Sequence, residues 1–293
     1  MAVSESRMSV RGASREASRG DSSGHVRGHA RGPTPAYVLH SHDWSESSLI
    51  LDLFCREQGR VVAIAKGAKR PYSQLRPVLM PFQRIAVGFG SRRGEDVEVW
   101  LLRQAEWAGG PAFRGGDALL PGFYLNELLM KLLPRHDPHP VLFEAYADTL
   151  HALAEPGLLQ AALRAFELIL LRQLGHLPDL SLQTVDGQRV MPGEPYELHP
   201  ELGVRPAHMM SEPGGGPTVL NGSVLLAMED ALSDGWLNDP RRVRPGHSPL
   251  PSLMAACVPA LVDLKSITRA LLHYHLGTNT LRTRQLMMEL QQP

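Results

Sequence analysis

The clearest indication of fold comes from two apolar runs, Ser48-Leu-Ile-Leu-Asp-Leu-Phe-Cys55 and Arg60-Val-Val-Ala-Ile-Ala-Lys66. Both are rich in branched aliphatic residues and have the length of β-strands. The segment between them, Glu57-Gln58-Gly59, has the composition of a tight turn. Strands joined by so short a connection pair antiparallel, so the sequence predicts a β-hairpin here.

Three further segments outside this hairpin also have strand character. Tyr37–Leu39 precedes it, and Gln83–Phe89 and Asp96–Leu102 follow it. In the last segment the residues alternate in polarity, which predicts a half-buried strand with Val99 and Leu101 on its apolar face. Five short strands are typical of a small closed barrel, and the OB-fold is the common five-stranded design. The pattern alone leaves an SH3-like barrel open.

From residue 111 onward the apolar spacing becomes helical. Leu125, Leu128 and Leu132, for example, recur at intervals of three and four residues. The first three helices have short links, which indicates a bundle, and Pro259 is expected to bend the fifth. The expected helices are 117–133, 141–153, 158–174, 223–232, 253–276 and 281–290.

Residues 176–218 interrupt this helical pattern. They are rich in proline and glycine and contain weak strand patterns only at Tyr196–Leu198 and Gly203–Arg205, so an irregular subdomain is expected. The fold class is therefore α+β, a five-stranded barrel followed by a mainly helical domain. The expected divisions are a disordered tail at 1–35, the barrel at 36–110, and the helical domain at 111–293 with its insertion at 176–218.

The composition excludes two classes of protein. Because 43% of the residues are hydrophobic, the chain can bury a core and is not fully disordered. Its 30 Lys and Arg equal its 30 Asp and Glu, so it is not basic all over. The polar tail 1–35 is the part of the chain that is expected to be disordered. It can be a solvated segment, an extension before a true start at Met8, or a transit peptide, and all three interpretations stay open.

Cysteine use and hydropathy indicate the compartment. Cys55 and Cys257 are far apart and have apolar neighbours, which favours buried thiols in a reducing cytoplasm. The longest apolar run, Leu158–Leu174, is interrupted by charged residues and falls short of the roughly 18 needed to cross a bilayer. We expect a cytoplasmic protein that does not enter membranes.

The neutral total conceals an uneven distribution of charge. The segment Gly59–Gly94 contains eight basic residues and no Asp or Glu, whereas residues 111–293 carry more acids than bases. An acid-free basic segment on a small barrel is suited to the phosphates of a nucleic acid, although an ordinary solvated charge run is the alternative. Tyr72 within it is a candidate for stacking on a base. The candidate DNA-binding residues are Arg60, Lys66, Lys69, Arg70, Tyr72, Arg76, Arg92 and Arg93.

Motifs of catalysis are missing from the sequence. The chain has no Gly-x-Ser-x-Gly elbow, no phosphate loop of the Gly-x-x-x-x-Gly-Lys type and no Gly-x-Gly-x-x-Gly fingerprint. Its 13 histidines do not form a metal-ligand motif on one helix face. We therefore predict that the protein is not an enzyme and has no cofactor.

The chain resembles the RecO family of bacterial DNA repair proteins in several short sequence motifs, which occur in the same order and with similar spacing. The resemblance extends from about Ala36 to Leu290. The motifs are Trp44-Ser-Glu-Ser-Ser-Leu, Gly59-Arg, Lys66-Gly-Ala-Lys-Arg, Leu79-Met-Pro-Phe82, Tyr124-Leu-Asn-Glu-Leu-Leu129, Leu163-Arg-Ala-Phe-Glu-Leu168, Leu174-Gly175, His275-Leu-Gly277 and Leu281-Arg-Thr-Arg284.

The resemblance implies an N-terminal OB-fold and a helical C-terminal domain. It implies a recombination mediator of the RecF pathway that binds single- and double-stranded DNA and anneals complementary strands. Its expected partners are RecR and the acidic tail of single-strand-binding protein, and through them it would help load RecA. Many members hold zinc with four cysteines, but Leu180–Gly187 contains none, so a zinc-free subdomain held by packing alone is expected.

For the acidic tail, the candidates are Lys131 and Arg164, because each is a cation on an otherwise apolar helix. Local pairing of Arg164 with Glu167 is the alternative. The competing function is an adaptor whose basic barrel meets RNA or an acidic protein, and a hydrolase is a more distant possibility.

Overall fold

The structure is a computed structural model that describes residues 32–90, 99–111, 113, 116–155, 157–207, 218–233, 247–277 and 281–290. Most of the tail expected at 1–35 lies outside these residues. So do Arg92 and Arg93, two of the candidate DNA-binding residues.

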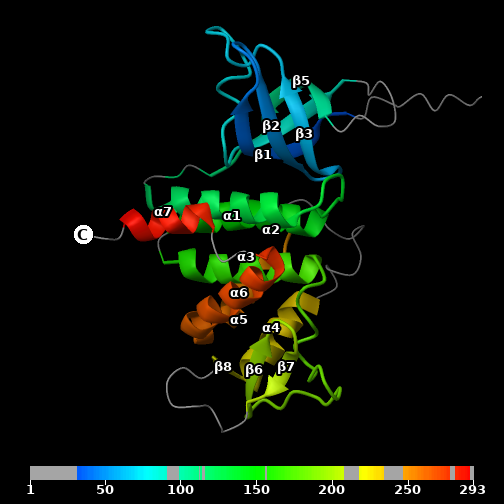
Figure 1. The fold of residues 1–293 in the computed structure, drawn as a ribbon, viewed down its shortest axis with the longest axis vertical. Coiled ribbons are helices and arrows are strands. Elements are labelled where there is room, and N and C mark those ends of the chain that lie inside the picture. Colours follow the sequence, from blue (N-terminus) through cyan, green and yellow to red (C-terminus); the bar gives the residue numbers. More distant parts are fainter. Residues whose placement is uncertain are drawn as a thin grey trace, which may run out of the picture.

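The N-terminal part of the chain is a closed five-stranded barrel, as predicted. The hairpin at 48–66 is present, and Cys55 lies opposite Gly59 across its turn. The first strand closes the barrel against the fourth, and the third pairs parallel with the fifth. The strands are β1 (Thr34–Asp43), β2 (Leu49–Cys55), β3 (Gly59–Ala65), β4 (Arg84–Phe89) and β5 (Val99–Trp107), in the order β1-β2-β3-β5-β4 (Figure 1).

The first part of β1, up to Leu39, and most of β2 are buried on both faces. Alternate residues such as Val38 point into the barrel core, and their neighbours Tyr37 and Phe54 belong to the core of the helical region. The Tyr37 ring lies 5.3 Å from that of Phe143 and 4.9 Å from that of Tyr146. Burial on both sides explains why β2 is an almost continuous apolar run instead of an alternating one.

Strand β5 differs from its prediction. Val99 was expected to face inward, but it is exposed, whereas Trp100 and Leu102 pack against the barrel core. On β4, the residues Gly88 and Phe89 are adjacent, but their partners on β5 are Gln104 and Leu102. This bulge inserts one extra residue and so changes which residues face inward, an effect that alternation in the sequence does not reveal.

The helical region is built around α3, in which every residue from Ala161 to Leu171 is buried. Helices α2, α5 and α6 pack against it. Figure 1 shows α1, α2 and α7 between the barrel and α3, with α4 and a small sheet at the far end. The helices are η1 (Gly116–Ala118), α1 (Leu119–Leu132), α2 (Pro140–Leu153), α3 (Leu159–Gln173), α4 (Gly222–Ser233), α5 (Leu250–Cys257), η2 (Val258–Ala260), α6 (Leu261–Leu276) and α7 (Arg282–Leu290).

A bend in the fifth helix was predicted at Pro259, whereas the structure has a 3-10 turn there that separates α5 from α6. Among the described residues, the continuous stretch Leu250–Leu276 is long and apolar enough to cross a membrane, contrary to our expectation from uninterrupted runs. A core helix meets the same criterion, and here Leu253, Leu264 and Leu271 are buried in the core of the helical region.

The segment expected to be irregular, 176–218, supplies two strands of a three-stranded antiparallel sheet. Both weak strand patterns are strands, namely β6 (Pro195–His199) and β7 (Gly203–Pro206), and β8 (Val219–Asn221) pairs with β6.

Packing is not the only interaction that holds this subdomain, which corrects our expectation. The Arg172 guanidinium at the end of α3 pairs with the Glu229 carboxylate of α4. The same carboxylate accepts a hydrogen bond of 2.8 Å from the Leu180 main-chain N–H. The Thr184 hydroxyl accepts one of 2.9 Å from the Val204 N–H. These bonds connect the cysteine-free segment to two helices and to its own sheet.

Candidate nucleic-acid interface

The acid-free basic segment is divided between two ends of the barrel. Asp43 lies opposite Leu49 on β2, and Leu49 lies opposite Ala65 on β3. The loops 44–48 and 66–83 therefore leave the barrel at one shared end. Arg60, beside the β2–β3 turn, lies at the other end, close to the helices.

The loop after β3 presents the exposed cations. Lys66, Arg70 and Arg76 are all exposed, and Tyr72 is 94% exposed. Residues 66–83 contain no acid, so nothing within the loop neutralises these charges. Three of the predicted cations and the predicted aromatic side chain thus lie together on one loop.

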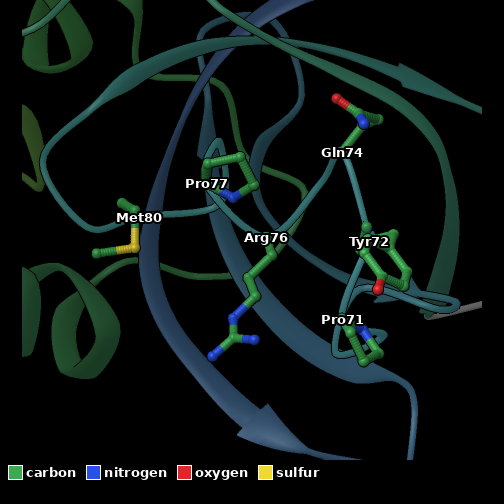
Figure 2. A pocket seen from close by; sticks show the side chains of 7 residues that line it. Pro71, Tyr72, Gln74, Arg76, Pro77 and Met80 are labelled. Atoms are coloured by element: carbon green, nitrogen blue, oxygen red, sulfur yellow. The ribbon is translucent and has the colours of Figure 1, made fainter.

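This loop also surrounds an open depression. Figure 2 shows the Arg76 side chain with Tyr72 on one side of it and Met80 on the other. An apolar wall with one cation at its centre can accept a flat ring against Tyr72 and a phosphate at Arg76. The lining residues are Pro71, Tyr72, Ser73, Gln74, Arg76, Pro77 and Met80.

Lys69 has a different environment from its neighbours. Its side chain is only 31% exposed, and its ammonium group pairs with the Asp43 carboxylate at 2.9 Å. Its main-chain N–H donates to the Ser47 carbonyl at 3.0 Å. Lys69 therefore connects the loop 66–83 to the β1–β2 loop.

Arg60 does not belong to this surface. Its side chain is 13% exposed and pairs with Asp52 at 3.0 Å. The guanidinium also donates to the main-chain carbonyl of Met130 in the last turn of α1. Cations at a helix C-terminus are favourable because the last carbonyl groups there lack helical partners. Arg60 therefore joins the barrel to α1, and we remove it from the proposed DNA surface.

A buried carboxylate holds the same joint on α2. Glu144 has no exposed surface and pairs with Arg56 at 2.8 Å and with Arg84 at 3.7 Å. The Arg84 guanidinium also lies over the Phe143 ring, 5.4 Å from its centroid. Two cations of the barrel thus bind one carboxylate of the helical region.

The close approach of the two regions also explains one glycine. Gly59 has a φ of +68°, and a Cβ atom there would lie 2.0 Å from the Asp137 carbonyl oxygen. The barrel and the helices are consequently in direct backbone contact at this end, whereas Arg70, Tyr72 and Arg76 at the opposite end are exposed.

The two candidates for an acidic partner differ in accessibility. Arg164 has a side chain only 8% exposed, pairs with Glu167 at 2.7 Å and donates to the Thr268 hydroxyl at 3.4 Å. The alternative interpretation, local pairing with Glu167, therefore describes its environment. Lys131 is 38% exposed near the end of α1 and lies 3.5 Å from Glu127. Of these two candidates, Lys131 is the more accessible to a partner.

Our sequence reasoning did not select Trp44 as a candidate. Its side chain is 61% exposed in the β1–β2 loop, next to Asp43, the partner of Lys69. A tryptophan within an otherwise polar loop between two strands was a usable indication, because an exposed aromatic ring near a basic loop can stack on an unpaired base.

The cysteines and the metal donors do not indicate catalysis. Both thiols are buried as predicted, and burial raises the pKa of Cys257 to about 12 and raises that of Cys55 as well, so neither is a thiolate at neutral pH. Within the described ranges, no three His, Cys, Asp or Glu side chains are grouped as metal ligands. The zinc of cysteine-bearing family members therefore does not fit the residues present.

Comparison with known proteins agrees with this architecture. The family described as "Recombination protein O N terminal" matches residues 30–110, and "Recombination protein O C terminal" matches 115–207. The chain is 48% identical to the DNA repair protein RecO of Polaromonas sp. (strain JS666) over 259 residues, covering 88% of this chain and 96% of that protein. It is also 48% identical to the DNA repair protein RecO of Polaromonas naphthalenivorans, again over 88% of this chain and 96% of that protein. The chain therefore belongs to the RecO family of DNA repair and recombination proteins.

Proposed function

We propose that this protein binds single- and double-stranded DNA through the loop 66–83 at one end of its barrel, and that it anneals complementary strands. One observation carries the proposal, namely that Lys66, Arg70 and Arg76 are exposed beside Tyr72 on a loop without acids.

The binding energy would come largely from the phosphates. Each phosphate that a cation neutralises releases condensed counterions, so the logarithm of affinity falls with the logarithm of salt by about 0.7 per contact on a single strand. Such binding does not depend on sequence, which suits a repair protein that meets arbitrary DNA.

Annealing requires two polyanions to approach each other, and the exposed cations of the loop would reduce their repulsion. Arg92 and Arg93 belong to the same acid-free basic segment, and we retain them as predicted further DNA contacts. The process moves no covalent bond, so we propose a binding protein and not an enzyme.

The remaining surface is available to protein partners. We propose that the protein acts in the cytoplasm, at the nucleoid, with RecR, and that it helps load RecA onto DNA coated by single-strand-binding protein. Lys131 is retained as a contact for the acidic tail of the coating protein because its side chain is 38% exposed.

A strand-annealing assay at several salt concentrations tests this function, using naked strands and strands coated with single-strand-binding protein. Lys66→Glu combined with Arg70→Glu should abolish annealing at moderate salt. Lys265→Glu combined with Arg269→Glu makes the same charge change on an exposed face of α6 and serves as the matched control. Equal loss in both double variants would contradict a role specific to the loop.

The adaptor alternative uses the same loop with another ligand. A competition between single-stranded DNA, RNA and an acidic peptide separates the two functions. Displacement of DNA by RNA at equal or lower concentration would favour the adaptor that binds RNA.

A further inference from the structure

We propose that Trp44 stacks on unpaired nucleobases and that Lys69 is the positioning residue that holds it there. The proposal rests on DNA binding by the loop 66–83 and adds a ligand class to that surface, namely the bases of a single strand.

The exposure of Trp44 is the first observation. Two other tryptophans lie among the described residues. Trp100 packs edge-on against Phe89, with 4.9 Å between ring centroids, and the Trp107 indole N–H donates to the Gln83 amide oxygen at 2.9 Å. Trp44 is 61% exposed and Trp107 is 65% exposed, but Trp44 lies in a polar loop, whereas Trp107 lies at the end of β5 and is hydrogen-bonded through its indole N–H. An indole ring offers a large flat face, which suits every base because every base has a π-face.

The second observation is that the loop carrying Trp44 is already ordered. The Trp44 and Ser45 main-chain N–H groups both donate to the Ser48 carbonyl, at 3.1 and 3.4 Å. The Gly67 N–H donates to the Ser48 hydroxyl at 3.4 Å. An ordered loop loses little conformational entropy when it binds, so the ring is presented to a ligand in advance.

Lys69 provides the remaining bonds between the two loops. Its ammonium group contacts the Asp43 carboxylate at 2.9 Å and donates to the Ser45 carbonyl at 3.4 Å, one residue before and one residue after Trp44. Its main-chain N–H is bonded to the Ser47 carbonyl. The charge of Lys69 is therefore used within the protein, and its role is to fix Trp44 beside the basic loop.

The arrangement distinguishes single strands from duplexes. Trp44 and Tyr72 are two exposed aromatic side chains on neighbouring loops at one end of the barrel, with exposed cations on the second loop. In a duplex the bases are stacked on each other inside the helix, so only the phosphates are available to this surface. On a single strand both the phosphates and the faces of the bases are available.

Three ligands separate the contributions of bases and phosphates, namely an oligothymidylate, an abasic strand of the same length and a duplex. Trp44→Ala should weaken binding of the oligothymidylate about tenfold and leave the abasic strand and the duplex unchanged. Trp44→Phe should retain most of the affinity. Trp107→Ala, at the other well-exposed tryptophan, is the matched control and should not change it. The proposal is overturned if Trp44→Ala has no effect, or if it weakens all three ligands equally.

Fluorescence gives a second measurement that does not depend on affinity. Stacking quenches an indole, so oligothymidylate should quench the protein's emission, and Trp44→Phe should remove most of that change. Trp107→Phe should leave it in place. Persistence of the full quench in Trp44→Phe would show that another tryptophan meets the bases.

The role of Lys69 is tested by the salt dependence of binding. Lys69→Ala should weaken oligothymidylate binding without changing the slope on salt, whereas Lys66→Ala should lower that slope by about 0.7. An equal decrease in both variants would make Lys69 a phosphate contact. If the wild-type protein binds none of the three ligands, the proposed function itself fails. If it binds with the expected salt dependence and Trp44 has no effect, only this inference fails.

Discussion

The Arg60 guanidinium on β3 donates a hydrogen bond to the main-chain carbonyl of Met130, and so it connects the barrel to the last turn of α1. It also pairs with the buried Asp52 carboxylate. A cation that the sequence placed among the DNA contacts thus holds the two regions together.

Replacing Arg60 should therefore affect stability and leave DNA binding intact. In Arg60→Met the aliphatic stem is kept, but Asp52 loses its partner, and the free energy of unfolding should fall by about 1.5–3 kcal/mol. Lys66→Met is the matched control, with the opposite result: weaker DNA binding and a stability change within about 0.5 kcal/mol. Urea unfolding and DNA titration measure both. Wild-type stability with impaired DNA binding in Arg60→Met would return this residue to the DNA surface.

Arg164 should also act on stability. It is buried with Glu167, so Arg164→Met leaves a buried carboxylate unbalanced and should cost about 3 kcal/mol of unfolding free energy. Binding of an acidic peptide should be weakened by Lys131→Glu instead, as measured by fluorescence anisotropy. The account is wrong on this point if Arg164→Met is as stable as wild type and no longer binds the peptide.

The docking of α7 should depend on pH. Burial tends to raise the pKa of Glu127, but hydrogen bonds from Thr283 and Arg282 and the charge of Lys131 outweigh it and lower this pKa below its ordinary value. Because the pKa is lowered in the folded state, the ionised carboxylate contributes stability at pH values above the unfolded pKa of about 4.3. This contribution is lost as the pH falls from there through the lower pKa of the folded state.

Amide exchange of the first turn of α7 should therefore quicken as the pH falls below about 4, after correction for the intrinsic rate. In Glu127→Gln the exchange should be faster already at pH 7 and should no longer change with pH in this range. A pH dependence that persists in the glutamine variant would assign the effect to another group.

The small sheet should be stable without metal. The carboxylate of Glu229 holds Arg172 and the Leu180 N–H, and the segment 176–207 has no cysteine to bind zinc. A chelator should leave the melting temperature unchanged, whereas Glu229→Ala should lower the free energy of unfolding by about 1–3 kcal/mol. A lower melting temperature after chelation would reveal a metal that the donor set does not indicate.

Much of the fold was accessible from local patterns. The hairpin β2–β3 and the helices α1–α3 follow from apolar spacing and turn composition, which act between residues close in the chain. The pairing of Arg60 with Asp52 was also within reach. In the predicted hairpin Arg60 lies opposite Phe54, and Asp52 is two residues further along on the same face.

Other features depended on contacts between distant segments. The bulge at Arg103 in β5 shifts the inward face from Trp100 and Leu102 to Ala105, and nothing in the local pattern indicates it. Arg60 contacts α1 across 70 residues of chain, so a basic residue that appeared to be a ligand contact is a structural one. Charge alone identified the loop 66–83 as a candidate, but only the structure separates the exposed Lys66 from the paired Lys69.

The most direct test of the account is the affinity for a single-stranded oligonucleotide measured across salt concentrations. In Lys66→Glu combined with Arg70→Glu, the affinity at moderate salt should fall strongly, and the slope on salt should decrease by about 0.7 for each lost phosphate contact. The Lys265→Glu and Arg269→Glu control should keep the wild-type slope. Unchanged affinity and slope in the loop variant would contradict the claim that this end of the barrel binds DNA.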